Sequence, residues 1–433
     1  MASTRAGGAR AGGRRYLVLA VAWAAAIGLH VWYGNRHHFF DLGIYYRAVR
    51  WWAHGHDIYS YSQPDKVEGS LGFTYPPFAA VLLRPLAYLS LGGAQAVFQT
   101  VSVAMMVMVV WLLIRPAAGR LGYPTGFAVA LALPFLSWLE PVRETFSFGQ
   151  INFIVVGLVV VDLLVAMPRG SRLAGVGIGL ATAIKLTPAI FIVYLLLTRR
   201  WRAAATATAT AAAATLLTAA ASWNDSWRFW TRLLWETDRV GRVDRVQNQS
   251  LTGVLARLAR PDDPNTLAWA LLAALIVGYG LWRARSAALA GDEVTGLTLT
   301  ALVGCAVSPV TWTHHLVWFV PAVIVLVEAA GDRHVPLGRR RSLGVLAALL
   351  YGSVAFSVVA WYDWHIVVRS RVDKGVPGFL IDSWYLILIL VLLVALPIRR
   401  LPAGDAAGGR EGRGSDPITS AAGASAGTVR SPG

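Results

Sequence analysis

The chain has 433 residues, of which 56% are hydrophobic and only 14% are charged, and its mean hydropathy is +0.54. Soluble domains carry about 25% charged residues, so this composition argues against a soluble globular protein. The formal net charge of +16 would suit a nucleic-acid-binding protein. However, the arginines gather at the ends of hydrophobic segments, which is typical of membrane orientation signals. We therefore expect no nucleic-acid partner.

Hydrophobic segments recur along the whole chain, and windows of about 18 to 20 residues with almost no charge can cross the hydrocarbon core as helices. Because lipid cannot satisfy irregular backbone or open sheet edges, the spans should be α-helical. We predict an all-α polytopic membrane protein. The predicted spans lie near residues 16–34, 94–114, 123–139, 150–167, 203–222, 266–283, 293–312, 314–331, 342–361 and 379–398, with a hairpin over 173–197.

Short arginine-rich segments determine the predicted orientation. They lie at residues 14–15, 115–120, 168–172, 198–202, 283–285, 338–341 and 399–400. Placing all of them in the cytoplasm satisfies the positive-inside rule. With the hairpin counted as two crossings, the chain then crosses about twelve times with both termini inside. We expect one membrane domain over residues 1–402 and a disordered cytoplasmic tail over residues 403–433, which are rich in Gly, Ala, Ser and Pro.

The first outer loop, residues 35–93, contains the segment FFDLGIYY with a single acid, Asp41. Asp is a favoured helix N-cap, so Asp41 either caps the helix that follows, acts as a catalytic carboxylate at the outer membrane surface, or does both. We predict that this helix lies on the membrane surface, because its apolar positions suit such a helix. These positions are Ile44, Tyr45, Val49 and Trp52.

The same loop contains the segment LGFTYPPF, in which Pro76 and Pro77 exclude a regular helix. Thr74 and Tyr75 before them should be extended. The alternative is that the prolines only begin a helix. The apolar run that follows is too short to cross, so we predict a membrane-surface helix there. A second interfacial helix is predicted over SWRFWTRLLW, residues 226–235.

The hairpin over residues 173–197 lies between two arginine-rich flanks that both favour the cytoplasm. Two full spans need about 40 residues, so the segment should turn at membrane depth, at KLTP (185–188). Non-helical backbone at that depth must lie inside protein or beside a wet cavity. Lys185 should therefore bind an anionic ligand in a cavity, the alternative being that it snorkels to the interface. The small residues of GVGIG before it indicate close helix packing.

Other polar side chains gather on the predicted outer face. His314 and His315 lie where one span ends and the next begins, and they either form an interfacial pair or hydrogen-bond to a phosphate or sugar. Adjacent histidines point to different sides of a helix and make a poor metal pair. Gln150, Asn152 and Gln249 offer amides that suit sugar hydroxyls. We expect neither a metal site nor a cofactor, since no metal or nucleotide motif is present.

Six segments in this order resemble glycosyltransferase family 87. They are DLGIYYRAV, GFTYPPFAAVLL, FGQIN, AIKLTPAIF, NQSLTGVL and SPVTWTHHLVW, and the resemblance covers about residues 14 to 400. The family comprises the polyprenol-phosphate-mannose-dependent α-(1→2)-mannosyltransferases of the actinobacterial cell envelope. It implies the GT-C fold, a multi-helix enzyme of the cell membrane with an extracytoplasmic active site.

The resemblance also implies roles for individual residues. It makes Asp41 the catalytic base, and Thr74 to Phe78 should line the same cavity, with Tyr45 beside the acid. We assign Lys185 and one of His314 or His315 to the donor phosphate from their expected positions. The donor would be polyprenyl-phosphomannose and the acceptor a mannolipid: a phosphatidylinositol mannoside, lipomannan or lipoarabinomannan. Two alternatives stay open, namely an envelope transferase of another sugar such as arabinofuranose, and a multi-span transporter.

Overall fold

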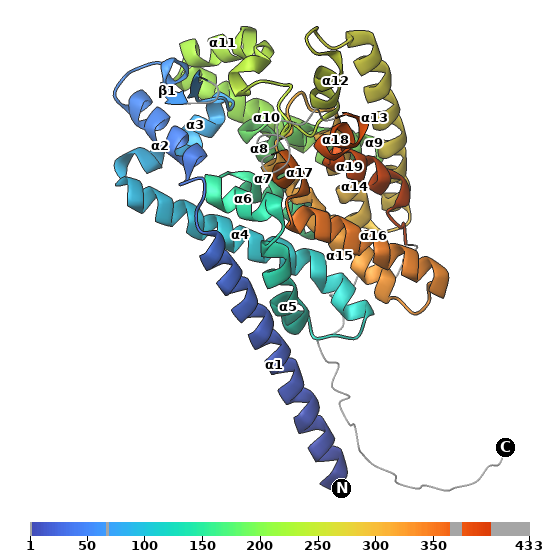
Figure 1. The fold of residues 1–433 in the computed structure, drawn as a ribbon. Helices are drawn as coiled ribbons and strands as arrows, with labels where there is room; N and C mark the ends of the chain where they lie inside the picture. The colour runs from blue at the N-terminus through green and yellow to red at the C-terminus, as the bar shows by residue number, and fades with distance from the viewer. Residues whose placement is uncertain (1, 66–68, 364–374, 400–433) are drawn as a thin grey trace, which may run out of the picture.

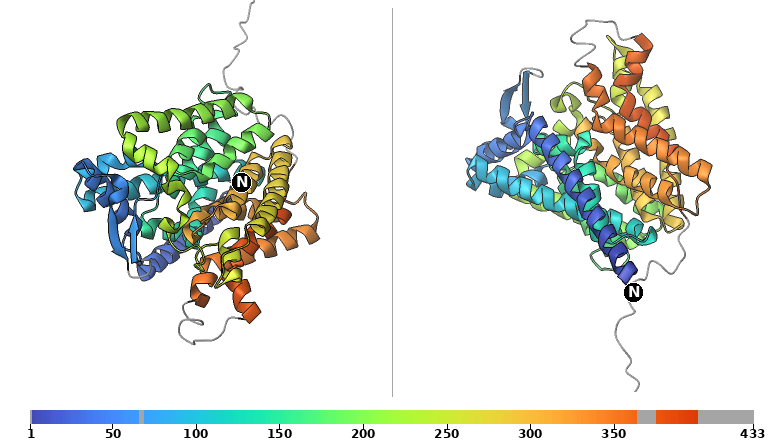
Figure 2. Two further views of the ribbon diagram at one scale, coloured as in Figure 1. Left: turned by 90° about the horizontal axis from the view of Figure 1, so that it is seen from above. Right: turned by 60° about the horizontal axis from the view of Figure 1, so that its bottom comes forward.

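The computed structural model describes residues 2–65, 69–363 and 375–399, and helices dominate that part of the chain. The described strands are β1 (Ser62–Asp65) and β2 (Gly69–Gly72), an antiparallel pair that stands out from the helical body in Figure 2. The predicted all-α class is confirmed, although the strand pair was not predicted. The predicted disordered tail lies outside the described residues.

The helices match the predicted spans in position, but several are short or bent. Within the described residues, five helices are long and apolar enough to cross a membrane, or up to seven if each of two bent pairs counts as one span. The first bent pair is α5 (Thr125–Ser137) with α6 (Glu140–Phe148), at 73°, and the second is α18 (Gly375–Asp382) with α19 (Trp384–Ala395), at 65°. The count of about twelve crossings stays a prediction.

The long helices α1 (Ala2–Tyr33), α4 (Leu91–Arg120), α10 (Trp201–Ala221) and α13 (Thr266–Leu289) each reach across the molecule. Shorter apolar helices complete the body. They are α7 (Asn152–Val161), α14 (Glu293–Val307), α15 (Phe319–Gly331) after a 3-10 turn over Thr313–Trp318, α16 (Leu337–Ala355) and α17 (Val358–Tyr362). Helix α1 runs along α5 and extends beyond the rest of the body (Figure 1).

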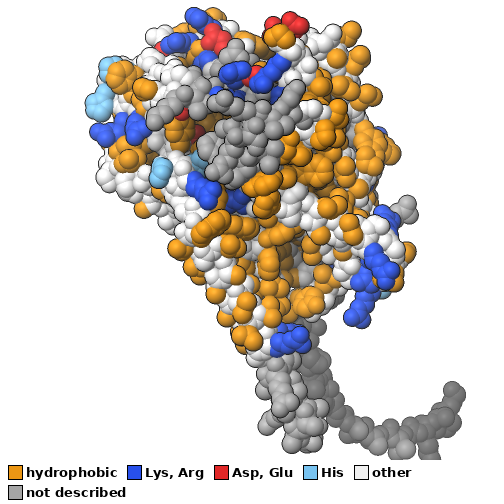
Figure 3. Space-filling view, in the orientation of Figure 1, with side chains coloured by type: hydrophobic (Ala, Val, Ile, Leu, Met, Phe, Trp, Pro, Cys, Tyr) orange, Lys and Arg blue, Asp and Glu red, His pale blue; other side chains and the backbone are white. Residues whose placement is uncertain are grey.

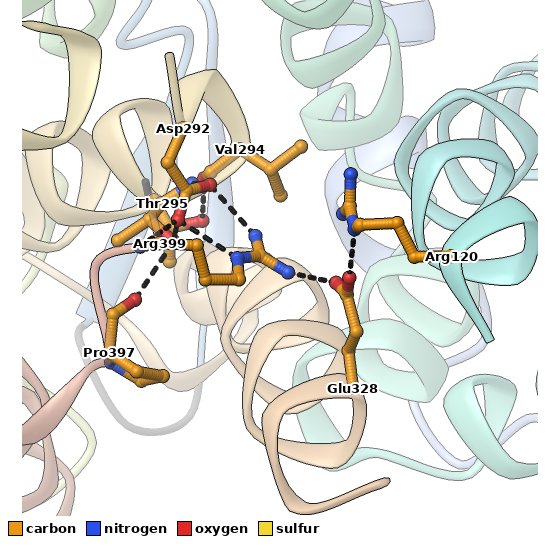
Figure 4. Close-up of polar contacts among 8 residues, drawn as sticks. Arg120, Asp292, Val294, Thr295, Glu328, Pro397 and Arg399 are labelled. Atoms are coloured by element: carbon orange, nitrogen blue, oxygen red, sulfur yellow. Dashed lines mark hydrogen bonds and ion pairs between the residues drawn. The ribbon is translucent and has the colours of Figure 1, made fainter. Parts of the chain in front are cut away.

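Ionic contacts join several helix ends on one side of the molecule. Arg120, at the end of α4, places its Nε 2.5 Å from Glu328 at the end of α15. Arg399 also binds Glu328 and lies 2.8 Å from Asp292, which caps α14 (Figure 4). Two of the arginine-rich segments predicted to share one side, 115–120 and 399–400, therefore meet. Charged groups that are mostly buried need such partners.

The surface between the two ends of the molecule suits lipid. In the view of Figure 3, hydrophobic side chains cover much of the right side and lower half of the molecule, while many of the Lys and Arg side chains lie in the upper part and at the lower right edge. The crossing segment of α1 is the extreme case, with only 6% of its residues buried inside the protein. A soluble protein would not expose so much continuous apolar surface, so this surface supports a membrane protein.

The predicted hairpin has the expected shape. Helix α8 (Val176–Ile184) ends at Lys185, whose backbone is extended, and α9 (Ile190–Leu197) begins after a short 3-10 turn. Both ends of the hairpin lie beside the start of α10, because Arg202 donates a hydrogen bond to the carbonyl of Ser171 at 2.5 Å and the backbone N–H of Arg200 binds Leu195. The chain therefore enters and returns on one side, with Lys185 at the turn.

Close packing explains the small residues before the turn, as predicted. Gly175 has φ +107, and a Cβ there would lie 2.2 Å from the carbonyl oxygen of Ala203 in α10. Asp162, after α7, accepts hydrogen bonds from the backbone N–H groups of Gly175 and Ile178 at 2.8 and 2.9 Å. These contacts hold the start of α8 in place, because a carboxylate favours the positive end of a helix.

We predict that a cysteine at Thr187, in a Cys305→Ser background, is labelled by a membrane-impermeant thiol reagent only from outside. Thr187 lines a cavity at the turn, and the predicted orientation opens that cavity outward. Cysteines at Arg172 and Arg199 should be labelled only from the cytoplasm. Labelling of these two flanks from opposite sides of the membrane would show that the segment crosses, and would overturn the hairpin.

The structure adds one finding about the predicted surface helix of the first loop. Helix α2 (Phe40–Ala53) forms as expected, and its apolar side chains, including Ile44, Tyr45 and Val49, are buried in protein, so its position on the membrane surface stays a prediction. They pack against α3 (Pro77–Leu83), the 3-10 turn over Arg84–Tyr88 and neighbouring helices. A surface helix whose apolar stripe meets other elements buries it there. The segment after Pro77 does expose apolar side chains, as predicted: Val81, Leu82, Tyr88 and Leu89.

The second predicted interfacial helix forms as α11 (Trp223–Thr231). It exposes Trp223 and Trp227, which stack with ring centroids 5.6 Å apart, and buries Phe229 on its other side. Exposed tryptophan beside arginine is typical of a helix at the boundary between lipid and water.

Candidate active site

Asp41 lies in the first turn of α2 but does not cap it. The N-cap is Phe39, with a left-handed backbone and no side-chain capping bond. The carboxylate of Asp41 instead accepts a hydrogen bond from Nε2 of Gln150 at 2.6 Å. The structure thus argues against capping as the reason for this acid and joins it to a second predicted site residue.

Gln150 links Asp41 to two tyrosines. The hydroxyl of Tyr75 donates to Oε1 of Gln150 at 3.0 Å and accepts from the hydroxyl of Tyr45 at 3.0 Å. The hydroxyl of Tyr59 binds the carbonyl of Tyr75 at 2.8 Å, which holds that loop in place. Burial raises the pKa of Tyr75 well above its usual value, so its hydroxyl stays a neutral donor.

Glycine at position 149 allows this arrangement. Gly149 ends α6 with φ +71, and a Cβ there would lie 2.5 Å from the Cβ of Leu42 in α2. Only glycine combines a left-handed backbone with so close an approach. Helix α6 therefore ends directly against α2, and the next residue, Gln150, reaches Asp41.

Lys185 comes from the hairpin turn into the same group. Its Nζ lies 3.3 Å from Oδ1 of Asn152 and 5.6 Å from the centroid of the Tyr75 ring. The amide nitrogen of Asn152 in turn donates to the carbonyl of His314 at 2.7 Å. Predicted residues from four distant parts of the sequence thus form one contiguous polar group.

A cavity opens beside this group, and its lining is polar in one part and apolar in another. Its empty space is about 490 Å³, which includes some space open to solvent. Polar side chains form one part of its lining, namely Asn152, Lys185, Thr187, Thr311 and His315. Apolar side chains such as Val155, Phe191 and Trp318 form another. A cation next to an apolar wall suits a ligand with an anionic group attached to a hydrocarbon chain.

The two histidines lie at different places in the site. His315 lines the cavity, and its Nδ1 accepts a hydrogen bond from the backbone N–H of Trp312 at 3.2 Å. His314 is buried, with its ring centroid 5.2 Å from that of Phe148. Its Nε2 has no hydrogen-bond partner within the described residues. A buried nitrogen of this kind usually has a partner, so a bound substrate is a reasonable candidate for it.

Two predicted residues are not joined to this group by the structure. Gln249 is fully buried, and its amide binds the backbone of Asp382 at 2.7 Å and of Tyr385 at 3.0 Å. It positions the start of α19, and its role in substrate binding stays a prediction. Thr74 adjoins Tyr75 but makes no side-chain hydrogen bond within the described residues.

Sequence reasoning missed an ion pair close to the acid. His37 places its Nε2 2.7 Å from Glu144 of α6, and the hydroxyl of Tyr33 donates to the same carboxylate at 2.6 Å. The available signal was the polar segment EPVRETFS between two apolar runs, directly before FGQIN. Its partners lie more than 100 positions earlier in the chain, and no periodic pattern connects them.

Burial raises the pKa of Asp41 to about 6, although the Gln150 hydrogen bond and the charges of His37 and Lys185 act in the opposite direction. An ordinary Asp has a pKa near 3.9. A carboxylate with a pKa near neutrality can hold a proton taken from a hydroxyl group, which suits a general base.

We expect the pH dependence of kcat/KM to report this shift. A base must be deprotonated to act, so the rate should fall as the pH decreases through about 6, and not only near 4 where an exposed Asp titrates. The measurement is kcat/KM for sugar transfer between about pH 4.5 and 8. An acidic limb near pH 4 would contradict the predicted shift.

The described residues contain no group of three or more His, Cys, Asp or Glu side chains able to hold a metal ion. The chemistry that the site offers comes from one carboxylate, one lysine, two histidines and neutral hydroxyl and amide groups. One base with nearby cationic and hydrogen-bonding groups suits transfer of a sugar from a phosphate leaving group. Together with the helical membrane body, this defines a membrane glycosyltransferase.

The chain belongs to glycosyltransferase family 87, whose sequence profile it matches over residues 73–309. It is 34% identical to the polyprenol-phosphate-mannose-dependent α-(1-2)-phosphatidylinositol mannoside mannosyltransferase of Mycobacterium tuberculosis, over 90% of this chain and 93% of that protein. It is 32% identical to a phosphatidylinositol pentamannoside mannosyltransferase of the same species, with 73% of each chain covered.

Relatives with another sugar specificity match less of the chain. An α-(1->3)-arabinofuranosyltransferase of M. tuberculosis is 31% identical over only 38% of this chain and 37% of its own length. No solved structure matches the chain. The family assignment argues against the transporter alternative.

Proposed function

We propose that this protein transfers mannose from polyprenyl-phosphomannose to a mannose-containing lipid of the phosphatidylinositol mannoside class, forming an α-(1→2) bond. The observation that carries the proposal is the contiguous group of Asp41, Gln150, Tyr75, Lys185 and Asn152 beside a cavity that is polar in one part and apolar in another. Mannosyltransferases that cover most of the chain support the choice of sugar and acceptor.

In this mechanism Asp41 is the general base. It accepts the proton of an acceptor hydroxyl as that oxygen attacks the anomeric carbon of mannose, and the bond to the lipid phosphate breaks. A single displacement inverts a β-linked donor into an α-linked product and needs only one carboxylate, whereas a covalent route would need a second carboxylate as nucleophile. Gln150 orients the base, and Tyr45 and Tyr75 shield it.

The leaving phosphate is assigned to Lys185 together with His314 or His315. A cation and hydrogen-bond donors stabilise the negative charge that develops on the departing oxygens. The apolar walls of the cavity, including Phe191 and Trp318, would hold the first part of the polyprenyl chain. We propose that this site lies on the extracytoplasmic side of the cell membrane, since the positive-inside rule favours a cytoplasmic position for the arginine-rich segments.

The test uses purified protein in lipid with labelled polyprenyl-phosphomannose and a panel of acceptors: phosphatidylinositol mannosides of increasing size, lipomannan and lipoarabinomannan. We expect mannose transfer to at least one of them, with an α-(1→2) link shown by linkage analysis. A parallel reaction contains polyprenyl-phosphoarabinofuranose. Transfer from that donor alone would replace mannose by arabinofuranose, and transfer from neither donor would contradict the proposal.

A further inference from the structure

The turn that precedes Asp41 is held by the end of α6 through several polar contacts. The backbone N–H of His37 donates to Oγ of Ser147 at 3.0 Å, and the N–H of Phe39 donates to the carbonyl of Ser147 at 2.9 Å. Oγ of Ser147 also binds Oδ1 of Asn35 at 3.0 Å. Beside these contacts lies the His37–Glu144 pair, at 2.7 Å. The base is thus attached to a turn whose position α6 determines.

This turn has an unfavourable backbone conformation. His38 and Phe39 have φ of 50° and 56°, in the left-handed region that residues other than glycine seldom adopt. Such strained residues persist where surrounding contacts over-determine them, and they are often found next to reacting groups. Here they come directly before Phe40 and Asp41, so a release of the turn would move the carboxylate.

The ring of His37 also brings charge close to the base. The groups that act on Asp41 are the side chains of His37 and Lys185, the carboxylate of Glu144, and the neutral partners Gln150, Tyr45 and Tyr75. The His37 ring stacks on Phe148 with centroids 3.7 Å apart and its Nε2 lies 2.7 Å from Glu144, while the His314 ring centroid lies 5.2 Å from that of Phe148. Stacking and the ion pair together restrict where the imidazole can lie.

We propose that His37 and Glu144 form a positioning pair for the catalytic base. Glu144 holds the imidazole, the imidazole and Ser147 hold the strained turn, and the turn places the Asp41 carboxylate against Gln150. When the ring is protonated, its charge also favours the deprotonated, active form of Asp41. The inference rests on the proposed role of Asp41 as base and adds two residues to which neither the relatives nor the sequence motifs assign a function.

Three variants test the pair. His37→Gln keeps a polar side chain but removes the charge, and the acidic limb of kcat/KM should move to higher pH because Asp41 loses a neighbouring cation. The kcat at the pH optimum should fall on the order of 10- to 100-fold through misplacement of the base, with a nearly unchanged donor KM. His37→Lys restores a cation near Glu144 and should return the limb toward that of the wild type. Glu144→Gln should lower kcat by a similar factor.

The matched control is His334→Gln, the same change at an exposed histidine that lies outside this turn and the candidate site. It should leave the pH profile and kcat unchanged. The double variant His37→Gln/Glu144→Gln should lose no more activity than either single variant, because residues that act as a unit are not additive. Thermal unfolding of each variant in detergent accompanies the kinetics.

An unmoved acidic limb in His37→Gln, or strictly additive losses in the double variant, would overturn the pair. If His37→Gln is poorly folded, Glu144→Gln decides the matter by itself, because a wild-type kcat in a folded Glu144→Gln variant would overturn the pair. Failure of the pair is distinguishable from failure of the proposed function. In the first case Asp41→Asn is inactive while the His37 variants keep the wild-type profile, and in the second Asp41→Asn itself stays active.

Discussion

Asp41→Asn should lose on the order of 10²- to 10⁴-fold in the rate of transfer, the usual contribution of a positioned general base, while it expresses and folds like the wild type. Asn has nearly the same shape, and its side-chain oxygen can still accept the hydrogen bond that Nε2 of Gln150 donates at 2.6 Å. The substitution removes the negative charge of the side chain and with it the ability to take a proton. The measurement is the single-turnover rate at saturating donor and acceptor.

The matched control for Asp41→Asn is Asp263→Asn, the same change at an exposed aspartate, which should keep the wild-type rate. If Asp41→Asn transfers mannose at a near wild-type rate, the base lies elsewhere. The first candidates would then be His314, whose Nε2 has no partner within the described residues, and His315 in the cavity wall.

Lys185→Met should weaken the response to the donor and leave the affinity for the acceptor almost unchanged. Met keeps the length of the side chain but removes the charge that lies between Asn152 and the ring of Tyr75. A hydrogen bond to a charged group contributes about 1.5 to 3 kcal/mol, which corresponds to roughly a 10- to 150-fold increase in the donor concentration needed. Donor and acceptor titrations measure the two effects separately.

These titrations should be run at about pH 7.5, above the range in which the carboxylate titrates. Lys185 also favours the deprotonated form of Asp41, so at lower pH its removal would impair the base as well as donor binding. Normal donor kinetics at this pH would show that Lys185 has no part in donor binding and would leave snorkelling as the explanation for its place in the membrane.

Several features could be predicted because they depend on neighbouring residues in the chain. Hydrophobic length predicted the helices, and 25 residues between two arginine-rich flanks predicted a hairpin whose turn lies at Lys185. The prolines after Tyr75 predicted an irregular segment followed by a helix, and α3 begins at Pro77. Each of these conclusions follows from backbone restriction or from the cost of polar groups in lipid.

Whether the apolar face of a helix packs against lipid or against protein could not be predicted in the same way. Helix α2 has a stripe that suits lipid and protein equally, and only the neighbouring elements decide that Tyr45 and Val49 lie inside. The bends between α5 and α6 and between α18 and α19 are of the same kind. Gln249 also shows this limit, since an amide that would suit sugar hydroxyls instead satisfies the backbone at the start of α19.

The sequence by itself determined the class of protein, the approximate helices, the hairpin turn and most of the candidate site: Asp41, Tyr75, Gln150, Asn152, Lys185 and the two histidines. These conclusions follow from composition, from the physics of chain segments in lipid and from recognisable motifs. Only the tertiary structure decided that Asp41 binds Gln150 and not its own helix, and that His37 and Glu144 meet beside it. Those contacts join residues about 110 positions apart. Their geometry depends on how α1, α2 and α6 pack, which no local pattern in the sequence specifies.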